Sequence, residues 1–133
     1  QSTRMKFPEW LMVFGDPTYR NKKCPPESAE QITAFNWLRA NGFSTAIHAR
    51  NEGKRHHAQT TKQKAEGMTA GASDIIIPSK QTFVCELKRQ DHTMSKWQPN
   101  QLDYLEQCHK DGAFVCVALG YKGVIEGVKQ WKS

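Results

Sequence analysis

The residues of this sequence best suited to chemistry are two carboxylates and a lysine, Asp74, Glu86 and Lys88. Glu86 and Lys88 stand two positions apart in the β-rich run 82–89 (TFVCELKR). Because successive side chains of a strand point to opposite faces, this carboxylate and this ammonium project from the same face. On its own the spacing is more typical of a solvated, charged face on an edge strand, so the pattern needs support from elsewhere in the chain.

That support comes from a second β-rich run, 74–78 (DIIIP), which only three residues, 79–81, separate from the first. Two such runs predict an antiparallel hairpin centred on Lys80. In that register Asp74 lies directly across from Glu86. Opposed carboxylates repel each other unless a cation lies between them, and their hard oxygen atoms suit Mg²⁺ or Mn²⁺. The hairpin therefore predicts a divalent-metal site.

A carboxylate-bound divalent ion can stabilise the charge that develops during phosphodiester hydrolysis and can activate the attacking water. Lys88, one strand repeat beyond Glu86, would lie near that water or near the scissile phosphate, and its role could be either or both. The trio thus indicates a metal-dependent phosphodiesterase.

The composition is that of a basic globular domain. The chain has 133 residues, of which 38% are hydrophobic and 24% charged, which is enough for one domain with one core. Nineteen Lys and Arg against thirteen Asp and Glu give a formal charge of +6, which favours a polyanionic partner such as nucleic acid.

No run is apolar enough to cross a membrane, and the first ten residues lack the core of a signal peptide, so we expect a cytoplasmic protein. Four scattered cysteines without a CxxC pair argue against disulfides and a zinc site.

The elements that must position the trio can be predicted from periodicity. Residues 1–24 are expected to form an irregular arm that packs on the core, and 25–133 a single domain. Ile32, Phe35 and Leu38 have helical spacing and predict a helix over 27–41. A strand is expected at 43–49, followed by a basic loop over 50–71 with room for a short helix.

In the last third of the chain, Pro99 suits the first position of a helix that stops at Gly112. The apolar run 113–119 (AFVCVAL) predicts a strand buried on both faces, and a final short helix is expected over 124–131. This order of helices and strands predicts an α/β sandwich around a mixed sheet.

An aspartate, a hairpin and then Glu-Leu-Lys resembles the PD-(D/E)XK nucleases, and the wider sequence resembles the VRR-NUC family within them, especially its small standalone phage members. The resemblance extends over 27–131. It departs from the family pattern at Ser73, usually Pro, and at Glu52, usually a second Gly. The matching residues are His48, Asn51, Gly53, Lys54 and Arg55 in an H-x-x-N-G-G-K-R block, Lys64, Glu66, Gly67, Gly71 and Asp74 in a K-x-E-G-x-x-x-G-x-x-D block, Glu86 to Arg89 in ELKR, and Gln101, Gly112 and Gly120 beyond it.

The resemblance implies a restriction-endonuclease-like fold and an Mg²⁺- or Mn²⁺-dependent endonuclease acting on branched, flapped or four-way DNA. It further implies a homodimer in a bacterial or phage-infected cell. The implied catalytic residues are Asp74, Glu86, Lys88, Glu27 and Gln101, and the implied metal ligands are Asp74, Glu86, Glu27 and the backbone carbonyl of Leu87.

Two of these assignments leave alternatives open. Glu27 fits the helix motif better than Glu30, but Ser28 and Gln31 also fit a capping box, which would put Glu27 just outside the helix. Gln101 resembles a family glutamine that orders the site, yet a glutamine on a helix surface is often only solvated.

Basic residues around the site predict phosphate contacts that position DNA without reading its bases. The alternative is a solvated loop, and His48 could equally be a core histidine. Two further functions stay open, a non-catalytic nucleic-acid-binding module and an RNA-processing nuclease. The predicted phosphate-contacting residues are Lys54, Arg55, His56, Lys62, Lys64 and Arg89.

Overall fold

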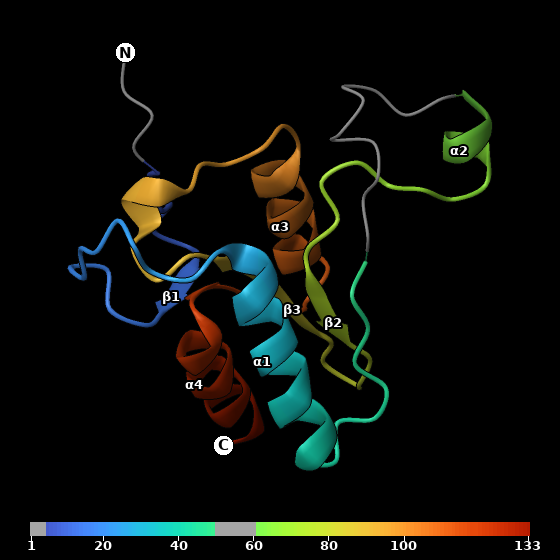
Figure 1. The fold of residues 1–133 in the computed structure, drawn as a ribbon. Coiled ribbons are helices and arrows are strands. Elements are labelled where there is room, and N and C mark those ends of the chain that lie inside the picture. The colour runs from blue at the N-terminus through green and yellow to red at the C-terminus, as the bar shows by residue number, and fades with distance from the viewer. Residues whose placement is uncertain (1–4, 50–60) are drawn as a thin grey trace.

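The computed structural model describes residues 5–49 and 61–133, which form a mixed sheet between two layers of helices (Figure 1). The strands are β1 (Met12–Phe14), β2 (Ile75–Ile77), β3 (Phe83–Lys88) and β4 (Phe114–Leu119), in the spatial order β1-β4-β3-β2. β1 and β3 run parallel to β4, and β2 runs antiparallel to β3. The predicted α/β architecture with a mixed sheet is confirmed.

Helices α1 (Glu27–Ala40) and α4 (Tyr121–Lys132) cover one face of the sheet, and α3 (Gln101–Lys110) covers the other (Figure 1). This layering follows from the alternation of side chains along β3. Phe83, Cys85 and Leu87 belong to the core beneath α1 and α4, whereas Val84 joins Leu105 of α3 in a second core. The short helix α2 (Thr61–Ala65) lies apart from the sheet, on the loop that leads to β2 (Figure 1).

The hairpin has the predicted register. Ile75 pairs with Cys85, Ile76 with Val84, and Ile77 with Phe83. The same register, extended to the residue just before β2, sets Asp74 opposite Glu86. The hairpin therefore brings the two acidic positions to the same end of the sheet.

Three expectations about elements are wrong. Residues 43–49 form turns with a single bridge, Ile47 to Ile76, because the segment folds back on the end of α1 through the bond from the Phe43 N–H to the Leu38 carbonyl (2.9 Å). Pro99 precedes α3 by two residues, and the left-handed Asn100 (φ 73°) is the N-cap. The arm is not irregular throughout, since Met12–Phe14 is the edge strand β1.

Other elements match the prediction closely. α1 begins at Glu27, α3 ends at Lys110 just before Gly112, and β4 is buried on both faces, whereas α4 begins three residues earlier than expected, at Tyr121. Within the described ranges, no helix is long and apolar enough to span a membrane.

Candidate metal and catalytic site

A cavity of about 320 Å³ opens where β3, the start of α1 and the start of α3 meet. Its walls come from segments far apart in the sequence, because the parallel pairing of β3 with β4 and the packing of α1 and α3 on opposite faces converge at this end of the sheet. The predicted residues Asp74, Glu86, Lys88, Glu27 and Gln101 all line it, together with Thr93, Met94, Ser95, Lys96 and Gln98.

Glu86 is the most deeply buried carboxylate of the cavity, with 1% of its surface exposed. Its Oε2 accepts a hydrogen bond from Gln101 Nε2 at 2.7 Å, whereas its buried Oε1 has no hydrogen-bond partner. Burial, followed by the charge of Asp74, raises the pKa of Glu86 well above its ordinary value, and the nearby Lys88 acts in the opposite direction. A nearby cation would therefore stabilise the ionised form of this buried carboxylate.

Asp74 lies at the entrance to β2 and is tied to β3 by its own side chain. Its Oδ2 accepts the backbone N–H of Leu87 at 2.9 Å, and its Oδ1 lies 3.8 Å from His48 Nε2. Its backbone carbonyl is 3.4 Å from Gln31 Nε2 on α1. These contacts hold the carboxylate beside Glu86, as the hairpin register predicts.

Lys88 and Gln101 form a buried hydrogen-bonded pair behind the carboxylates. The Lys88 ammonium donates to Gln101 Oε1 at 3.0 Å and to the Lys96 carbonyl at 2.9 Å, and it lies 3.7 Å from Glu86 Oε2. The Gln98 N–H also donates to Gln101 Oε1, at 2.8 Å. Gln101 is therefore not a solvated surface glutamine, since its amide links Glu86 to Lys88.

The two candidate glutamates of α1 occupy different surroundings. Glu27 lines the cavity, accepts a bond from Ser95 Oγ at 3.3 Å, and adds to the charges that raise the pKa of Glu86. Glu30 is buried and is not among the residues that line the cavity. Its carboxylate accepts hydrogen bonds from the Tyr121 N–H and the Gln90 side-chain amide, both at 2.8 Å. The capping box is wrong, because Pro26 is the N-cap and no side chain caps the helix.

These residues fit a divalent cation by their chemistry. The orphaned Glu86 oxygen, the opposed Asp74 and the neighbouring Glu27 supply hard, anionic ligands of the type that Mg²⁺ and Mn²⁺ prefer. In the described part of the chain, no three His, Cys, Asp or Glu side chains lie close enough together to hold a metal ion by themselves. Mg²⁺ usually keeps several of its own waters, which suits a cavity with few protein ligands.

Among solved structures, the chain is similar to a VRR_NUC domain protein, with a TM-score of 0.67 and 24% sequence identity over 82% of this chain and 89% of that one. The fold is that of a VRR-NUC domain. The expected restriction-endonuclease-like architecture is thereby confirmed, and at this identity the likeness concerns the fold alone. No family model and no curated protein matches the sequence.

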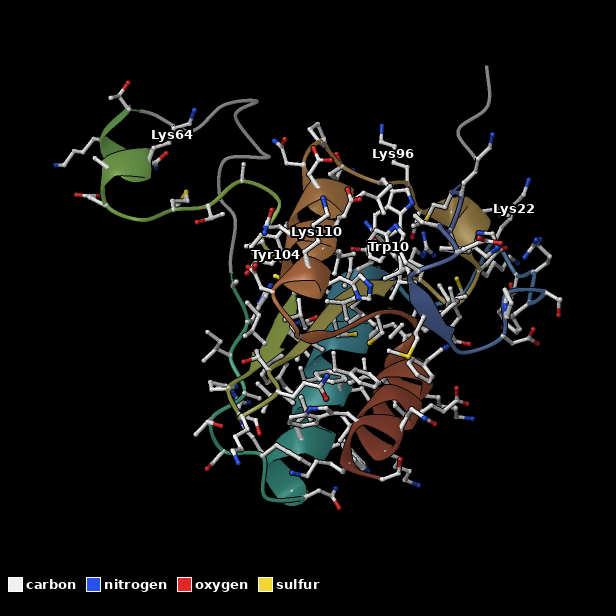
Figure 2. The ribbon with its side chains drawn as sticks, turned by 180° about the vertical axis from the view of Figure 1, so that it is seen from behind. Trp10, Lys22, Lys64, Lys96, Tyr104 and Lys110 are labelled. Carbon is white, nitrogen blue, oxygen red and sulfur yellow. The ribbon has the colours of Figure 1, made fainter. Side chains whose placement is uncertain are left out.

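The described basic residues that were predicted to contact phosphate lie in two separate parts of this VRR-NUC fold. Lys62 and Lys64 are exposed on α2, away from the cavity, and Figure 2 labels Lys64 there. Lys54, Arg55 and His56 lie outside the described residues. Arg89 donates to the carbonyls of Cys24 and Pro25, which anchors the loop before α1.

The VRR-NUC fold also brings residues to the cavity that sequence patterns did not single out for this role. Ser95 and Lys96 belong to the loop between the 3₁₀ helix η2 (His92–Met94) and α3, where no periodicity marks them; Lys96 is labelled in Figure 2. His48 is not a core histidine, since its side chain is 41% exposed and faces Asp74. Ser73 is fully buried, and its hydroxyl has no hydrogen-bond partner.

Proposed function

We propose that this protein is a divalent-metal-dependent endonuclease that hydrolyses DNA phosphodiester bonds. The observation that carries the proposal is the buried Glu86, which has one carboxylate oxygen without a hydrogen-bond partner and lines a cavity with Asp74 and Lys88. Two neighbouring carboxylates repel each other when both are ionised, and a bound cation would remove that repulsion.

In this proposal Asp74, Glu86, Glu27 and the Leu87 carbonyl hold Mg²⁺ or Mn²⁺. The ion, when bound, supplies charge stabilisation to the scissile phosphate and lowers the pKa of an attacking water. Gln101 holds Glu86 and Lys88 in a fixed relation through its amide, and Lys88 offsets part of the negative charge of the site. The ammonium also stands ready to contact the phosphate or orient the water.

We further propose DNA, in duplex or branched form, as the substrate. The formal charge of +6 and the exposed lysines of α2 support a polyanionic partner. The proposed selectivity for nicked, flapped or four-way DNA is supported by the sequence resemblance to the VRR-NUC family.

The test is cleavage of nicked, flapped and four-way DNA by purified protein with Mg²⁺, Mn²⁺ or EDTA. We expect cleavage with the metals and none with EDTA, and we expect Asp74→Ala to lose activity by about a thousandfold while still binding DNA. Asp103→Ala, which removes an exposed aspartate on α3, is the matched control and should cleave like the wild type. If folded wild-type protein cuts none of these substrates with either metal, the proposal is overturned.

Two alternative functions are separated by the same assay. A non-catalytic binding module on this fold would bind DNA with no activity for Asp74→Ala to remove. A parallel set of RNA substrates distinguishes an RNA-processing nuclease, because recognition of the 2′-hydroxyl leaves no readable mark in the sequence.

We also propose that the protein acts as a homodimer, because one such site cuts one strand and symmetric cleavage of a branched substrate needs two. Light scattering coupled to gel filtration should give about twice the mass of one chain at micromolar concentration. A monomer mass under conditions where the protein cleaves both strands would contradict this part of the proposal.

A further inference from the structure

The ammonium of Lys88 is enclosed by more than the two acceptors described above. Its Nζ also lies 5.5 Å from the centre of the Trp97 ring, within the range of a cation–π contact. Only 2% of the surface of Lys88 is exposed, so little water competes with this contact. The ring and the two acceptors together define where the ammonium can lie.

Trp97 is in turn held by the N-terminal segment. Its indole N–H donates to the Lys6 carbonyl at 2.9 Å, and its ring packs edge-on against Phe7, with 6.4 Å between ring centres. Phe7 makes a second edge-on contact with His92, at 5.2 Å. A continuous series of contacts therefore leads from Lys6 and Phe7 through Trp97 to Lys88.

We propose that Trp97 is a positioning residue for Lys88, and that Lys6 and Phe7 fix Trp97 in place. An ammonium has three N–H donors. The Lys96 carbonyl and Gln101 Oε1 take two of them. The indole face covers one side of the group, so the third donor is directed to the cavity shared with Glu86. This inference rests on the proposed nuclease function and assigns part of its machinery to the first residues of the chain.

The test compares Trp97→Phe and Trp97→Leu with the wild type in metal-dependent cleavage. Phe keeps a ring beside the ammonium and loses only the bond to Lys6, so kcat should stay within about threefold of the wild type. Leu removes the ring, and kcat should fall by about tenfold or more while KM changes less than about twofold. Phe7→Leu should shift kcat in the same direction by a smaller factor.

Trp10→Leu is the matched control. Trp10, labelled in Figure 2, belongs to the same N-terminal segment, packs against the same side of the sheet and stacks on His109 of α3 (5.4 Å between ring centres). Among the interactions of the described residues, the ring contact of Lys88 is with Trp97 and not with Trp10. The loss of Trp10 should lower the unfolding temperature about as much as Trp97→Leu and leave kcat unchanged. If the two variants have the same kcat, Trp97 is only a packing residue and the proposal is overturned.

A second measurement does not depend on cleavage. In protein labelled with ¹³C at the lysine Cε, the ring current of Trp97 should move the Lys88 Hε signals upfield, and Lys88→Met identifies those signals by their loss. The upfield shift should persist in Trp10→Leu and disappear in Trp97→Leu. An unchanged shift in Trp97→Leu overturns the proposal, whereas wild-type protein that shows the ring-current shift but cuts no substrate overturns the proposed function instead.

Discussion

Glu86 is the residue whose chemistry depends most on its surroundings. Burial and the charge of Asp74 raise its pKa above the ordinary carboxyl value of 4.5, so the folded, metal-free protein binds a proton there more tightly than the unfolded chain. The stability that this proton contributes is present below the ordinary pKa and is lost as the pH rises through the raised folded value. A divalent ion must displace the same proton to bind.

We therefore expect the rise in unfolding temperature that Mn²⁺ causes to be larger above the raised pKa of Glu86 than below it, because the proton on Glu86 competes with the metal. Thermal unfolding with and without the ion measures this. Glu86→Gln has no proton to displace and should lose both the stabilisation and its pH dependence. Equal stabilisation of the wild type at every pH at which it stays folded would contradict the assignment of Glu86 as a ligand.

Substitutions of Glu27 and Glu30, which are only three residues apart, should have opposite effects on metal binding and on stability. Glu27→Gln removes a charge at the cavity and should weaken metal binding while changing the free energy of unfolding by less than about 1 kcal/mol. Glu30→Gln alters a buried acceptor of the Tyr121 N–H and should cost about 1 to 3 kcal/mol without a direct effect on the metal. Calorimetric titration with Mn²⁺ and denaturant unfolding separate the two; the reverse pattern would make Glu30 the ligand.

Part of this site was predictable from residue types alone. The alternation of β3 and the symmetry of the hairpin about Lys80 fix which side chains face each other, so Asp74, Glu86 and Lys88 could be grouped before any coordinates. Ser95 and Trp97 could not, because they lie in an irregular loop where no repeat relates sequence position to direction. The family resemblance favoured Glu27 over Glu30, but the bond that engages Glu30 at the start of α4 could not be predicted from sequence.

At the scale of elements, the site depends on a contact between two loops. Gly71 lies in the loop that leads to Asp74, and Asn100 is the N-cap that precedes Gln101. Gly71 has φ +79°, and a Cβ there would stand 2.2 Å from the Asn100 carbonyl oxygen. This close approach sets the distance between the start of β2 and the start of α3.

Gly71→Ala should therefore push the two loops apart, which would cost about 2 kcal/mol or more of stability and move Gln101 away from Glu86. We expect kcat to fall by a larger factor than that of the control Gly67→Ala, whose added Cβ would meet no atom within 4 Å although its φ is also positive (+103°). Denaturant unfolding and steady-state cleavage measure the two effects. Similar losses in both variants would show that backbone strain, and not the contact with Asn100, is responsible.

Elements with strong periodicity were predictable, and those held by tertiary contacts were not. The Ile32, Phe35 and Leu38 spacing gave α1, and the apolar run of β4 gave a strand buried on both faces. The segment 43–49 has strand-forming residues but turns at the end of α1. β1 forms because β4 offers it an edge, which composition cannot indicate.

At the scale of the whole molecule, helix α2, which carries Lys62 and Lys64, lies away from the body of the fold (Figure 1). If these lysines contact phosphates, the double variant Lys62→Gln, Lys64→Gln should weaken DNA binding and lower the slope of log affinity against log salt by about two. The value of kcat at saturating DNA should not change.

The matched control is Lys129→Gln with Lys132→Gln, which removes the same charge from the last turn of α4, at the opposite end of the molecule from α2 (Figure 1). Fluorescence anisotropy over a range of salt concentrations measures both variants. Equal losses of affinity would mean that net charge alone attracts the DNA and that α2 makes no specific contact.

The pairing of β1 with β4 has a consequence for the behaviour of the protein in solution. Met12 and Phe14 pair with Cys116 and Ala118 across most of the chain length, and they cover the edge of a strand made almost entirely of apolar residues. If β1 detaches, that edge presents unpaired backbone groups to any other extended chain. The N-terminal segment that contacts Trp97 therefore also protects the edge of β4 from pairing with another chain.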